Sequence, residues 1–418
     1  MAILPLSMNI LLIAQNYHPC VGGVETHARQ VAQALRTKHS IQVVAGNFAS
    51  CQLPSQLGTL HTNLLAPAYA SHWDGNVQIH AFTPTWAERI RMLPIAVRTI
   101  PKLRRYAYNA LYEFGYPWYR RVYFPRLLQL MQGMDVVHSL AGGYLGWTAQ
   151  AAAQELGIPF VCTPFVHPHQ WGDEPASVAY YQRSQAVIGL VESDRQYLES
   201  LGVPAEKLHT VGVSPDLPPT SDPQQFRQQH GLVDVPLIVY AGRMMPQKGA
   251  KALLDSTALV WQTLPEAHFV FIGPSTAEST LWFQQPDPRV LYLGKVSHQE
   301  KANALAACDV FCMPSVSEIL PTVYLEAWSY GKPVIGGLAE GLPALVAGNQ
   351  AGITVSQAPE QVAESVIKLL QNPDLRAQFG SAGQALVTQN YTVEAVVSSL
   401  ETLYSQLIPT HAAMAEAK

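Results

Sequence analysis

The sequence has few charged residues and no long hydrophobic run. Charged residues make up 13% of its 418 residues and the net charge is −4, so no overall positive charge favours binding to nucleic acid. The apolar run at residues 10–14 is too short for a signal or membrane helix, and no basic segment precedes it. We therefore expect a cytoplasmic protein without a nucleic-acid partner, either in solution or peripheral on the cytoplasmic face of the membrane.

The sequence also lacks the common signatures of metal and dinucleotide sites. Its five cysteines form no Cys-x-x-Cys pair, and no neighbouring histidine or cysteine completes a zinc set with Cys308 and Cys312. No Asp-x-Asp motif is present, and no G-x-G-x-x-G follows any predicted strand, which argues against a dinucleotide-dependent oxidoreductase. We expect five reduced thiols and neither a bound metal nor a cofactor.

What is present is an alternation of short apolar runs with stretches of helical spacing, repeated in two halves. This alternation is typical of doubly wound parallel sheets. Four prolines between residues 215 and 223 mark a stiff linker between the halves. We predict an α/β protein with two doubly wound, Rossmann-like domains at residues 1–213 and 214–390. A C-terminal helix within residues 391–418 is expected to cross back onto the first domain.

Residues 315–337 place two carboxylates around the start of one predicted helix. The helix is predicted to begin at Thr322, whose hydroxyl can cap it. Glu318 comes just before it and Glu326 lies in its second turn. Free N–H groups and the positive end of the helix dipole favour a phosphate between the two. This space suits a nucleotide sugar, although for either glutamate taken singly the better explanation is that Glu318 is solvated and that Glu326 merely favours the helix dipole.

Two other turns have features that suit phosphate. Arg243 and Lys248 lie on one turn between a predicted strand and a helix, where they provide a planar fork and a point charge for a diphosphate. Gly22 and Gly23 stand where the first helix begins, so a phosphate could approach the backbone closely. A simple tight turn is the alternative for the two glycines.

Two histidines follow the predicted strands of the first domain. His138 lies near the carboxyl end of the strand at residues 135–139, and His167 lies in the proline-bounded loop at residues 164–168. Ligands of open α/β sheets gather at the carboxyl ends of strands. Both histidines are therefore candidates for the reacting centre, with a satisfied structural histidine as the alternative for His138.

Taken together, these motifs resemble those of the retaining family-4 glycosyltransferases. The family signature runs roughly S-x-x-E-G-L/F-P/G-x-x-x-x-E-A and then G-x-P-V-I, and this sequence reads SVSEILPTVYLEAWSYGKPVI, with Ile319 where glycine is usual. GRMMPQKG resembles the family's G-R-x-x-x-x-K-G loop, GGVE its first loop, and DVVH a histidine-bearing strand end. The resemblance covers residues 8–38, 135–213 and 237–355.

The resemblance implies the GT-B arrangement, in which the two domains face each other across a cleft, and a role for each matched residue. Arg243 and Lys248 would neutralise the diphosphate, and Glu326 would bind the ribose diol. His138, His167 and Glu318 would be catalytic, with Glu318 holding the sugar hydroxyls. The remaining contacts would come from Gly22 and Gly23 at the diphosphate, Val296 at the nucleobase, the N–H groups of Leu320 and Thr322, and Pro321, which shapes that loop.

The implied reaction is retaining transfer of a hexose from a nucleotide sugar to an acceptor hydroxyl. UDP-glucose is the expected donor, because UDP donors are common in the family. The expected acceptor is a saccharide or a lipid-linked molecule in exopolysaccharide or glycolipid biosynthesis. One alternative is a nucleotide-sugar 2-epimerase, which has no evident need for the G-R-x-x-x-x-K-G loop. Another is a non-catalytic nucleotide-sugar-binding partner, against which the intact glutamates and cations argue.

Residues 86–130 lie outside the resemblance and are rich in basic and aromatic side chains. They carry nine lysines and arginines against Glu88 and Glu113, together with ten aromatic residues. Prolines recur through the stretch, which predicts several short helices rather than one long helix. We expect this insert to contact an anionic membrane surface or a lipid-linked acceptor. The alternative is that the aromatic side chains pack inward and the arginines are merely solvated.

Overall fold

The computed structural model describes residues 7–20, 22–46, 70–169, 171–284 and 287–408. It divides into two compact units: the first runs to Val211 and resumes at Val396, and the second is Gly212–Ala395. Each unit contains one largely parallel sheet whose strand order runs outward in both directions from a central strand. Since such crossovers place helices on both faces of a sheet, each unit is doubly wound, and the predicted α/β class is confirmed.

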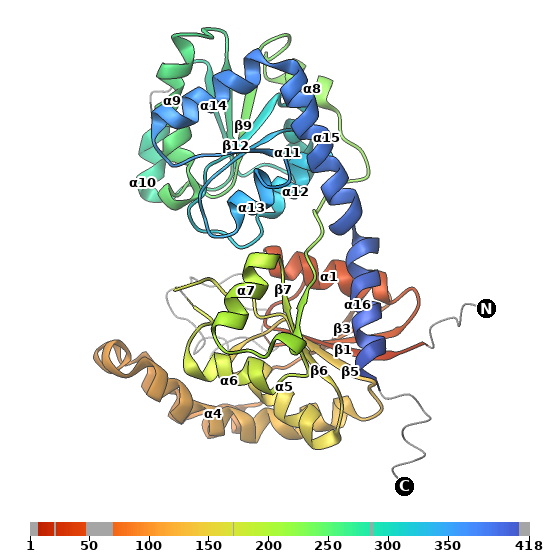
Figure 1. Ribbon diagram of the computed structural model, residues 1–418. Helices are drawn as coiled ribbons and strands as arrows, with labels where there is room; N and C mark the ends of the chain where they lie inside the picture. The colour runs from red at the N-terminus through yellow and green to blue at the C-terminus, as the bar shows by residue number, and fades with distance from the viewer. Residues whose placement is uncertain (1–6, 21, 47–69, 170, 285–286, 409–418) are drawn as a thin grey trace, which may run out of the picture. The chain divides into compact units, whose positions relative to one another are not determined.

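The sheet of the first unit has the order β3-β4-β2-β1-β5-β6-β7-β8 (Figure 1). Its strands are β1 (Asn9–Ala14), β2 (Ser40–Ala45), β3 (His72–Asp74), β4 (Val77–Ala81), β5 (Val136–Ser139), β6 (Phe160–Cys162), β7 (Ala186–Gly189) and β8 (Leu208–Thr210). All pairs are parallel except β3 with β4. Central β1 is buried beyond its first residue, as its continuous apolar sequence requires.

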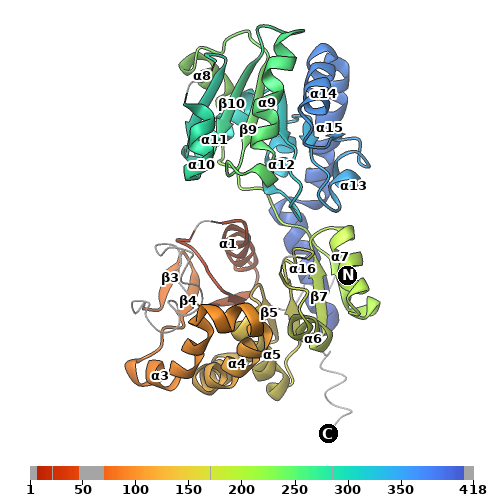
Figure 2. The ribbon, with the colours of Figure 1, turned by 90° about the vertical axis from the view of Figure 1, so that its left-hand side faces the viewer.

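Helices of the first unit flank this sheet (Figures 1 and 2). They are α1 (Gly23–Leu35), α3 (Trp86–Arg91), η4 (Leu93–Thr99), α4 (Pro101–Met131), α5 (Gly143–Leu156), α6 (Pro175–Arg183), α7 (Glu192–Ser200) and η5 (Ala205–Lys207), with most of α16 (Val393–Leu407). Glu401 of α16 accepts hydrogen bonds from Lys38 at 3.0 Å and lies 3.1 Å from the ring of His39. These contacts attach the end of the chain to the first unit.

The prediction that prolines divide the basic and aromatic insert into short helices is wrong for most of its length. Helix α4 continues for 31 residues with Pro117 and Pro125 inside it. An internal proline costs roughly 3 kcal/mol through a lost hydrogen bond and a steric clash. Burial of an apolar face along the same helix offsets this cost, because Tyr119, Tyr123 and Leu127 lie in the core that α4 shares with α5.

The second unit has an entirely parallel sheet with the order β11-β10-β9-β12-β13-β14. Its strands are β9 (Leu237–Ala241), β10 (His268–Ile272), β11 (Val290–Gly294), β12 (Val310–Met313), β13 (Val334–Gly336) and β14 (Gly352–Thr354). Its helices are α8 (Pro223–Gln229), η6 (Pro246–Lys248), α9 (Ala250–Trp261), α10 (Ala277–Thr280), η7 (Leu281–Phe283), α11 (His298–Ala307), α12 (Thr322–Ser329), α13 (Leu342–Val346), α14 (Pro359–Gln371) and α15 (Pro373–Asn390).

The strand order of the second unit reverses direction between β9 and β12. This is a topological switch point, where the loops that leave two neighbouring strands diverge to opposite faces of the sheet. The two loops are residues 242–249 and 314–321. The fold therefore brings both predicted phosphate and sugar loops to the position where open α/β sheets bind ligands.

The cysteines depart from the sequence-based expectation at one position. Cys162, Cys308 and Cys312 are free and buried, as expected. Cys20 is disulfide-bonded, so the expectation of a reduced thiol is wrong there. Among the described residues, no helix is both long enough and apolar enough to cross a membrane.

Candidate active site

The loops after β9 and β12 are joined by hydrogen bonds. The N–H of Val316 donates to the carbonyl of Gln247 at 2.9 Å, and the hydroxyl of Ser315 lies 3.1 Å from the same carbonyl. Gln357 donates through its amide to the carbonyls of Pro246 and Pro314, both at 2.9 Å. Each loop is therefore fixed by the other, which sets the backbone positions from which their side chains extend.

Two glycines allow these loops to pack closely. Gly249 has φ +84° and faces the backbone of Pro314, where a β-carbon would collide. Gly337, after β13, faces the backbone of Pro314 and Ser315 in the same way. The second glycine of the G-R-x-x-x-x-K-G loop is therefore required both by backbone conformation and by the close approach of the neighbouring loop.

Lys248 and Glu318, predicted to bind diphosphate and sugar, are in direct contact. The ammonium of Lys248 donates to Oε1 of Glu318 at 2.6 Å and to the carbonyl of Ser317 at 2.7 Å. The side chains are 23% and 15% exposed, respectively. Burial raises the pKa of Glu318, and Lys248, Ser315 and the exposed Arg243 partly oppose that rise. The two cations, Lys248 and Arg243, thus both act electrostatically on Glu318, and the three side chains share one local environment.

Glu326 lies on a buried face of α12 and is 2% exposed. Its carboxylate pairs with Lys301 of α11, whose ammonium is 2.8 Å from Oε1 and 2.7 Å from Oε2. Burial raises the pKa of Glu326, and Lys301 opposes the rise. The sequence analysis missed Lys301, because a lysine on a helix is usually solvated and no motif includes it.

The predicted cap of α12 is wrong by one residue. Pro321 is the N-cap residue, with φ −72° and ψ 108°, and Thr322 is the first helical residue without a capping side-chain bond. Proline fixes φ near this value, so it suits an extended N-cap position. The first N–H groups of a helix have no acceptor within it, so the N–H of Thr322, the first helical residue, suits its expected role. The expected role of Leu320, which precedes the N-cap, stays a prediction. Ile319 is buried and does not have positive φ, so its backbone does not require the family's glycine.

The expected nucleobase loop follows β11. Gly294 ends that strand with φ +64°, and Val296 two residues later is half-buried. Tyr292 stacks on Phe283 with ring centroids 4.4 Å apart. The assignment of Val296 to the base remains a prediction.

In the first unit, the switch point lies between β1 and β5, and Gly22 and Gly23 begin the helix after β1. Gly22 is the N-cap residue of α1. The carboxylate of Glu25 lies against it, where a β-carbon would overlap, and accepts a hydrogen bond from Asn16 at 3.0 Å. A diphosphate at this helix would have to displace a negative side chain, while nothing lies within 4 Å of a β-carbon built on Gly23.

His138 has the contacts of a structural histidine, the alternative considered above. Its ring is 1% exposed, with Nδ1 2.6 Å from the hydroxyl of Tyr404 and Nε2 2.8 Å from that of Thr163. Burial lowers the pKa of His138 to about 3, so the ring is neutral near pH 7. His167 is half-buried and packs on Trp171 at a centroid distance of 4.8 Å. Of the two, His167 is the better candidate for contact with a ligand.

Family comparisons agree with this geometry. A model described as "Glycosyl transferases group 1" matches residues 222–386, and one described as "Glycosyl transferase 4-like domain" matches residues 22–214. Together they span both units. The chain belongs to the group 1 glycosyltransferases.

Curated relatives of this group 1 glycosyltransferase are named for sugar transfer. A GDP-mannose-dependent monoacylated alpha-(1-6)-phosphatidylinositol monomannoside mannosyltransferase of Corynebacterium glutamicum is 33% identical over 183 residues, 41% of this chain and 48% of the relative. The sulfoquinovosyl transferase SQD2 of Arabidopsis thaliana is 28% identical over 316 residues, 69% of this chain and 61% of the relative. The chain thus spans about half to three-fifths of the length of these two relatives.

Solved structures confirm the GT-B fold class. Anabaena Alr3699/HepE in complex with UDP superposes with a TM-score of 0.70 at 18% identity, covering 96% of this chain and 100% of that one. A structure of the same protein with UDP-glucose gives 0.67 at 19% identity, covering 95% and 100%. At such identity the likeness concerns the fold. The cleft expected between the domains of this glycosyltransferase stays a prediction.

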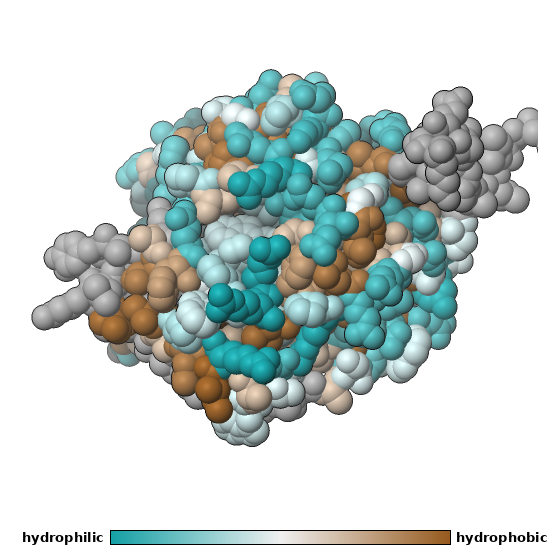
Figure 3. Space-filling view, turned by 90° about the horizontal axis from the view of Figure 1, so that it is seen from below, coloured by the Kyte–Doolittle hydropathy of each residue, from teal (hydrophilic) through white to brown (hydrophobic). Residues whose placement is uncertain are grey.

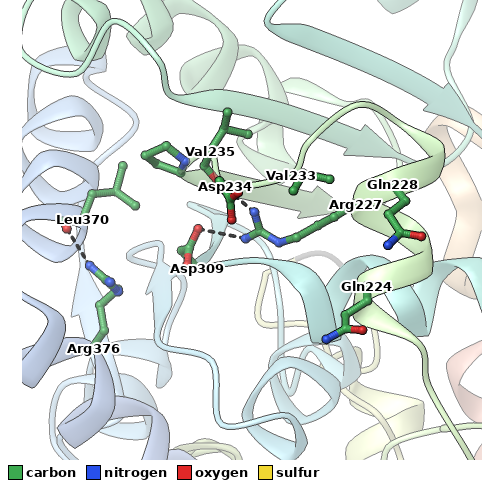
Figure 4. Close-up of a pocket in the computed structure, with 10 residues that line it drawn as sticks. Gln224, Arg227, Gln228, Val233, Asp234, Val235, Asp309, Leu370 and Arg376 are labelled. Carbon is green, nitrogen blue, oxygen red and sulfur yellow. Dashed lines mark hydrogen bonds and ion pairs between the residues drawn. The ribbon is translucent and has the colours of Figure 1, made fainter.

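A cavity of about 620 Å³ in the second unit of this glycosyltransferase lies away from the site (Figure 4). Its lining includes Pro236 and Asp309, which immediately precede β9 and β12, so it lies at the amino end of the sheet. Arg227 at its wall donates to the carbonyls of Leu232, Val235 and Ala307 and to Asp309. These bonds hold the start of the sheet together and leave this arginine with a structural role.

Proposed function

We propose that this protein is a retaining hexosyltransferase that moves a sugar from a nucleotide sugar to an acceptor hydroxyl. The observation that carries the proposal is the grouping at the switch point of the second unit. Arg243, Lys248 and Glu318 share one electrostatic environment after β9 and β12, and Glu326 follows in the helix that begins there. A diphosphate needs cations, and a sugar and ribose need acceptors for their hydroxyl hydrogens.

In the proposed reaction, the bond between the anomeric carbon and the diphosphate oxygen breaks, and its electron pair stays on that oxygen. The acceptor oxygen forms the new bond to the anomeric carbon, and its proton passes to the departing phosphate. Lys248 and Arg243 would neutralise the charge that grows on the diphosphate as it leaves. Because the loops are already fixed by hydrogen bonds, this stabilisation requires little reorganisation.

The contact between Lys248 and Glu318 gives the site an order of events. Without donor, the ammonium is paired with the carboxylate. A diphosphate competes for the ammonium, which frees Oε1 of Glu318 to accept hydrogen bonds from the sugar. His167 remains our candidate for contact with the sugar or acceptor, and the glycines Gly22 and Gly23 for contact with the diphosphate.

The proposed function and its alternatives differ in which nucleotide sugar is bound and in what happens to it, so a panel of donors tests the function directly. We expect UDP-glucose to bind and to be slowly hydrolysed by the purified protein, whereas the relative from Corynebacterium is named for GDP-mannose. The measurement is binding and hydrolysis of UDP-, GDP- and ADP-sugars. Hydrolysis of a GDP-sugar alone would correct the base, and binding without turnover, with or without acceptors, would favour the non-catalytic partner. Conversion of the donor to its 2-epimer would favour the epimerase.

The donor panel is also measured in the presence of the chelator EDTA, which tests whether transfer needs a metal. The sequence has no Asp-x-Asp motif, and Arg243 with Lys248 offers another source of positive charge, so we propose that transfer needs no metal. Turnover should be the same with EDTA and with magnesium or manganese. Loss with EDTA and recovery with either metal would assign the charge on the diphosphate to a cation instead of these side chains.

The acceptor is proposed to be a saccharide or a lipid-linked molecule, reached at an anionic membrane surface. Within the insert of residues 86–130, three strongly exposed apolar side chains lie on α3 and η4. Trp86, Ile90 and Leu93 are 80%, 66% and 55% exposed, and Arg89 lies over the ring of Trp86 at 5.3 Å. By contrast, most described aromatic side chains of α4 pack inward. Figure 3 shows one face of the molecule, on which hydrophobic residues lie next to hydrophilic ones. A tryptophan beside arginines suits a membrane interface.

Liposome sedimentation tests the membrane proposal. Wild-type protein should pellet with anionic vesicles at low salt and much less with neutral ones, since each basic residue near an anionic surface contributes roughly 1 kcal/mol. Trp86→Ser with Ile90→Ser should reduce pelleting several-fold, and so should Arg120→Gln with Arg121→Gln, while donor hydrolysis persists. Leu156→Ser, a partly exposed apolar residue at the end of α5, is the matched control. Equal pelleting on both vesicle types, or none, would leave a soluble acceptor as the better proposal.

A further inference from the structure

The carboxylate of Glu326 is buried, yet one of its oxygens has no hydrogen-bond partner. The side chain is 3% exposed, and Oε1 accepts a hydrogen bond from Lys301 at 2.8 Å. Oε2 lies 2.7 Å from the same ammonium but receives no hydrogen bond from any residue that the structure describes. Leaving a buried acceptor unsatisfied costs stability. Such an atom in a binding unit is a candidate to accept a hydrogen bond from a ligand.

Lys301 is placed to decide how that carboxylate is presented. It lies on the first half of α11, which begins at His298 directly after the loop expected to face the nucleobase. Its side chain is 27% exposed, so its stem crosses from the surface to the buried carboxylate. The ammonium donates a hydrogen bond to Oε1 and is ion-paired with Oε2 at 2.7 Å, and Oε2 has no hydrogen-bond donor among the described residues, so it can accept one from a ligand. A buried carboxylate without this partner would favour its protonated form.

We propose that Lys301 is a positioning residue that pairs with Glu326 and directs its Oε2 toward the ribose hydroxyls of the nucleotide. The inference rests on the proposed function, in which Glu326 meets the ribose diol. Lys301 itself does not take part in bond making or breaking. It acts through Glu326, so its contribution concerns donor affinity and the choice of ribose over deoxyribose.

Other charged groups around Glu326 do not replace Lys301. His298 from the same helix lowers the pKa of Glu326, Asp216 from the segment before α8 raises it, and Tyr330 follows α12 within electrostatic range. His298 is itself engaged with Asp216, whose carbonyl is 2.8 Å from its Nε2. Lys301 is the largest of the influences that lower the pKa. Its removal should therefore leave Glu326 protonated to a higher pH.

The test compares UDP with 2′,3′-dideoxy-UDP by calorimetry, or the guanine pair should the donor panel select GDP. Wild-type protein should prefer the nucleotide with hydroxyls. Lys301→Met should weaken UDP binding about tenfold, the usual scale for a hydrogen bond to a charged group, and leave dideoxy-UDP binding unchanged. As the pH is lowered, the variant should also lose UDP affinity at a higher pH than wild type does. Lys301→Arg should restore most of the UDP affinity and of its pH dependence. Lys368→Met, an exposed lysine of α14, is the matched control.

The outcomes separate this inference from the proposed function. If wild type prefers UDP and Glu326→Gln does not, but Lys301→Met behaves like wild type, only the role of Lys301 is overturned. If Lys301→Met weakens both nucleotides equally, with no shift in pH dependence, it has a general structural role and the inference also fails. If wild type binds both nucleotides of each pair equally, Glu326 is not at the ribose. If neither pair binds, the proposed function fails as well.

Discussion

Lys248→Ala is expected to lower turnover of the donor by about 10²- to 10³-fold, or roughly 3–4 kcal/mol, which is the range found when one preorganised donor to a developing negative charge is removed. The ammonium donates a hydrogen bond to the carbonyl of Ser317 at 2.7 Å, so this contact can hold the ammonium near the diphosphate after Glu318 is displaced. Its attraction increases as charge grows on the leaving oxygen. The loss should therefore appear mainly in kcat and less in KM.

The control for this variant separates catalysis from folding. Lys248→Ala also leaves the half-buried Glu318 without its partner, so some loss of stability is expected, and thermal unfolding should be measured beside turnover. Lys251→Ala is the matched variant, because this partly exposed lysine lies three residues later and pairs with Asp255 among the described residues. Arg243→Ala should resemble Lys248→Ala. Turnover that follows unfolding temperature across all three variants would contradict a role at the diphosphate.

The sheet and its loops were predictable because the signals are local. A strand buried on both faces in a parallel sheet must be a short apolar run, and β9 and β12 both fit that description. Such runs alternating with helices define doubly wound units. Since parallel strands end at the same edge, residues just after β9 and β12 had to meet. Lys248 and Glu318 are 70 residues apart in sequence and lie in contact for that reason.

What the sequence could not show depends on partners far along the chain. His138 is bonded to Tyr404, 266 residues away, and no local pattern distinguishes that histidine from one that faces a ligand. Helix α4 continues through two prolines because its apolar face is buried against α5, a tertiary effect that exceeds the local penalty. The role of Lys301 likewise depends on Glu326 being buried beside it.

Glu318→Gln is expected to separate binding of the sugar from binding of the nucleotide. The substitution keeps the shape of the side chain and removes its charge, so affinity for UDP-glucose should fall about tenfold through weaker hydrogen bonds to the sugar hydroxyls. UDP alone should bind as well as before or more tightly, because Lys248 is no longer held by a carboxylate. Calorimetry with UDP and UDP-glucose measures the difference, and Glu360→Gln, on the exposed start of α14, is the control.

The pH profile of donor hydrolysis gives an independent reading of the same residue. Burial raises the pKa of Glu318 above its ordinary value, and the carboxylate is the form that accepts hydrogen bonds from the sugar. Activity should therefore be lost, as pH falls, at a higher pH than an exposed glutamate would produce. Lys248→Ala removes an influence that lowers this pKa, so it should move the acid limb upward, whereas Glu318→Gln should abolish that limb. Equal losses of UDP and UDP-glucose affinity in Glu318→Gln, with an unchanged acid limb, would place Glu318 outside the sugar pocket.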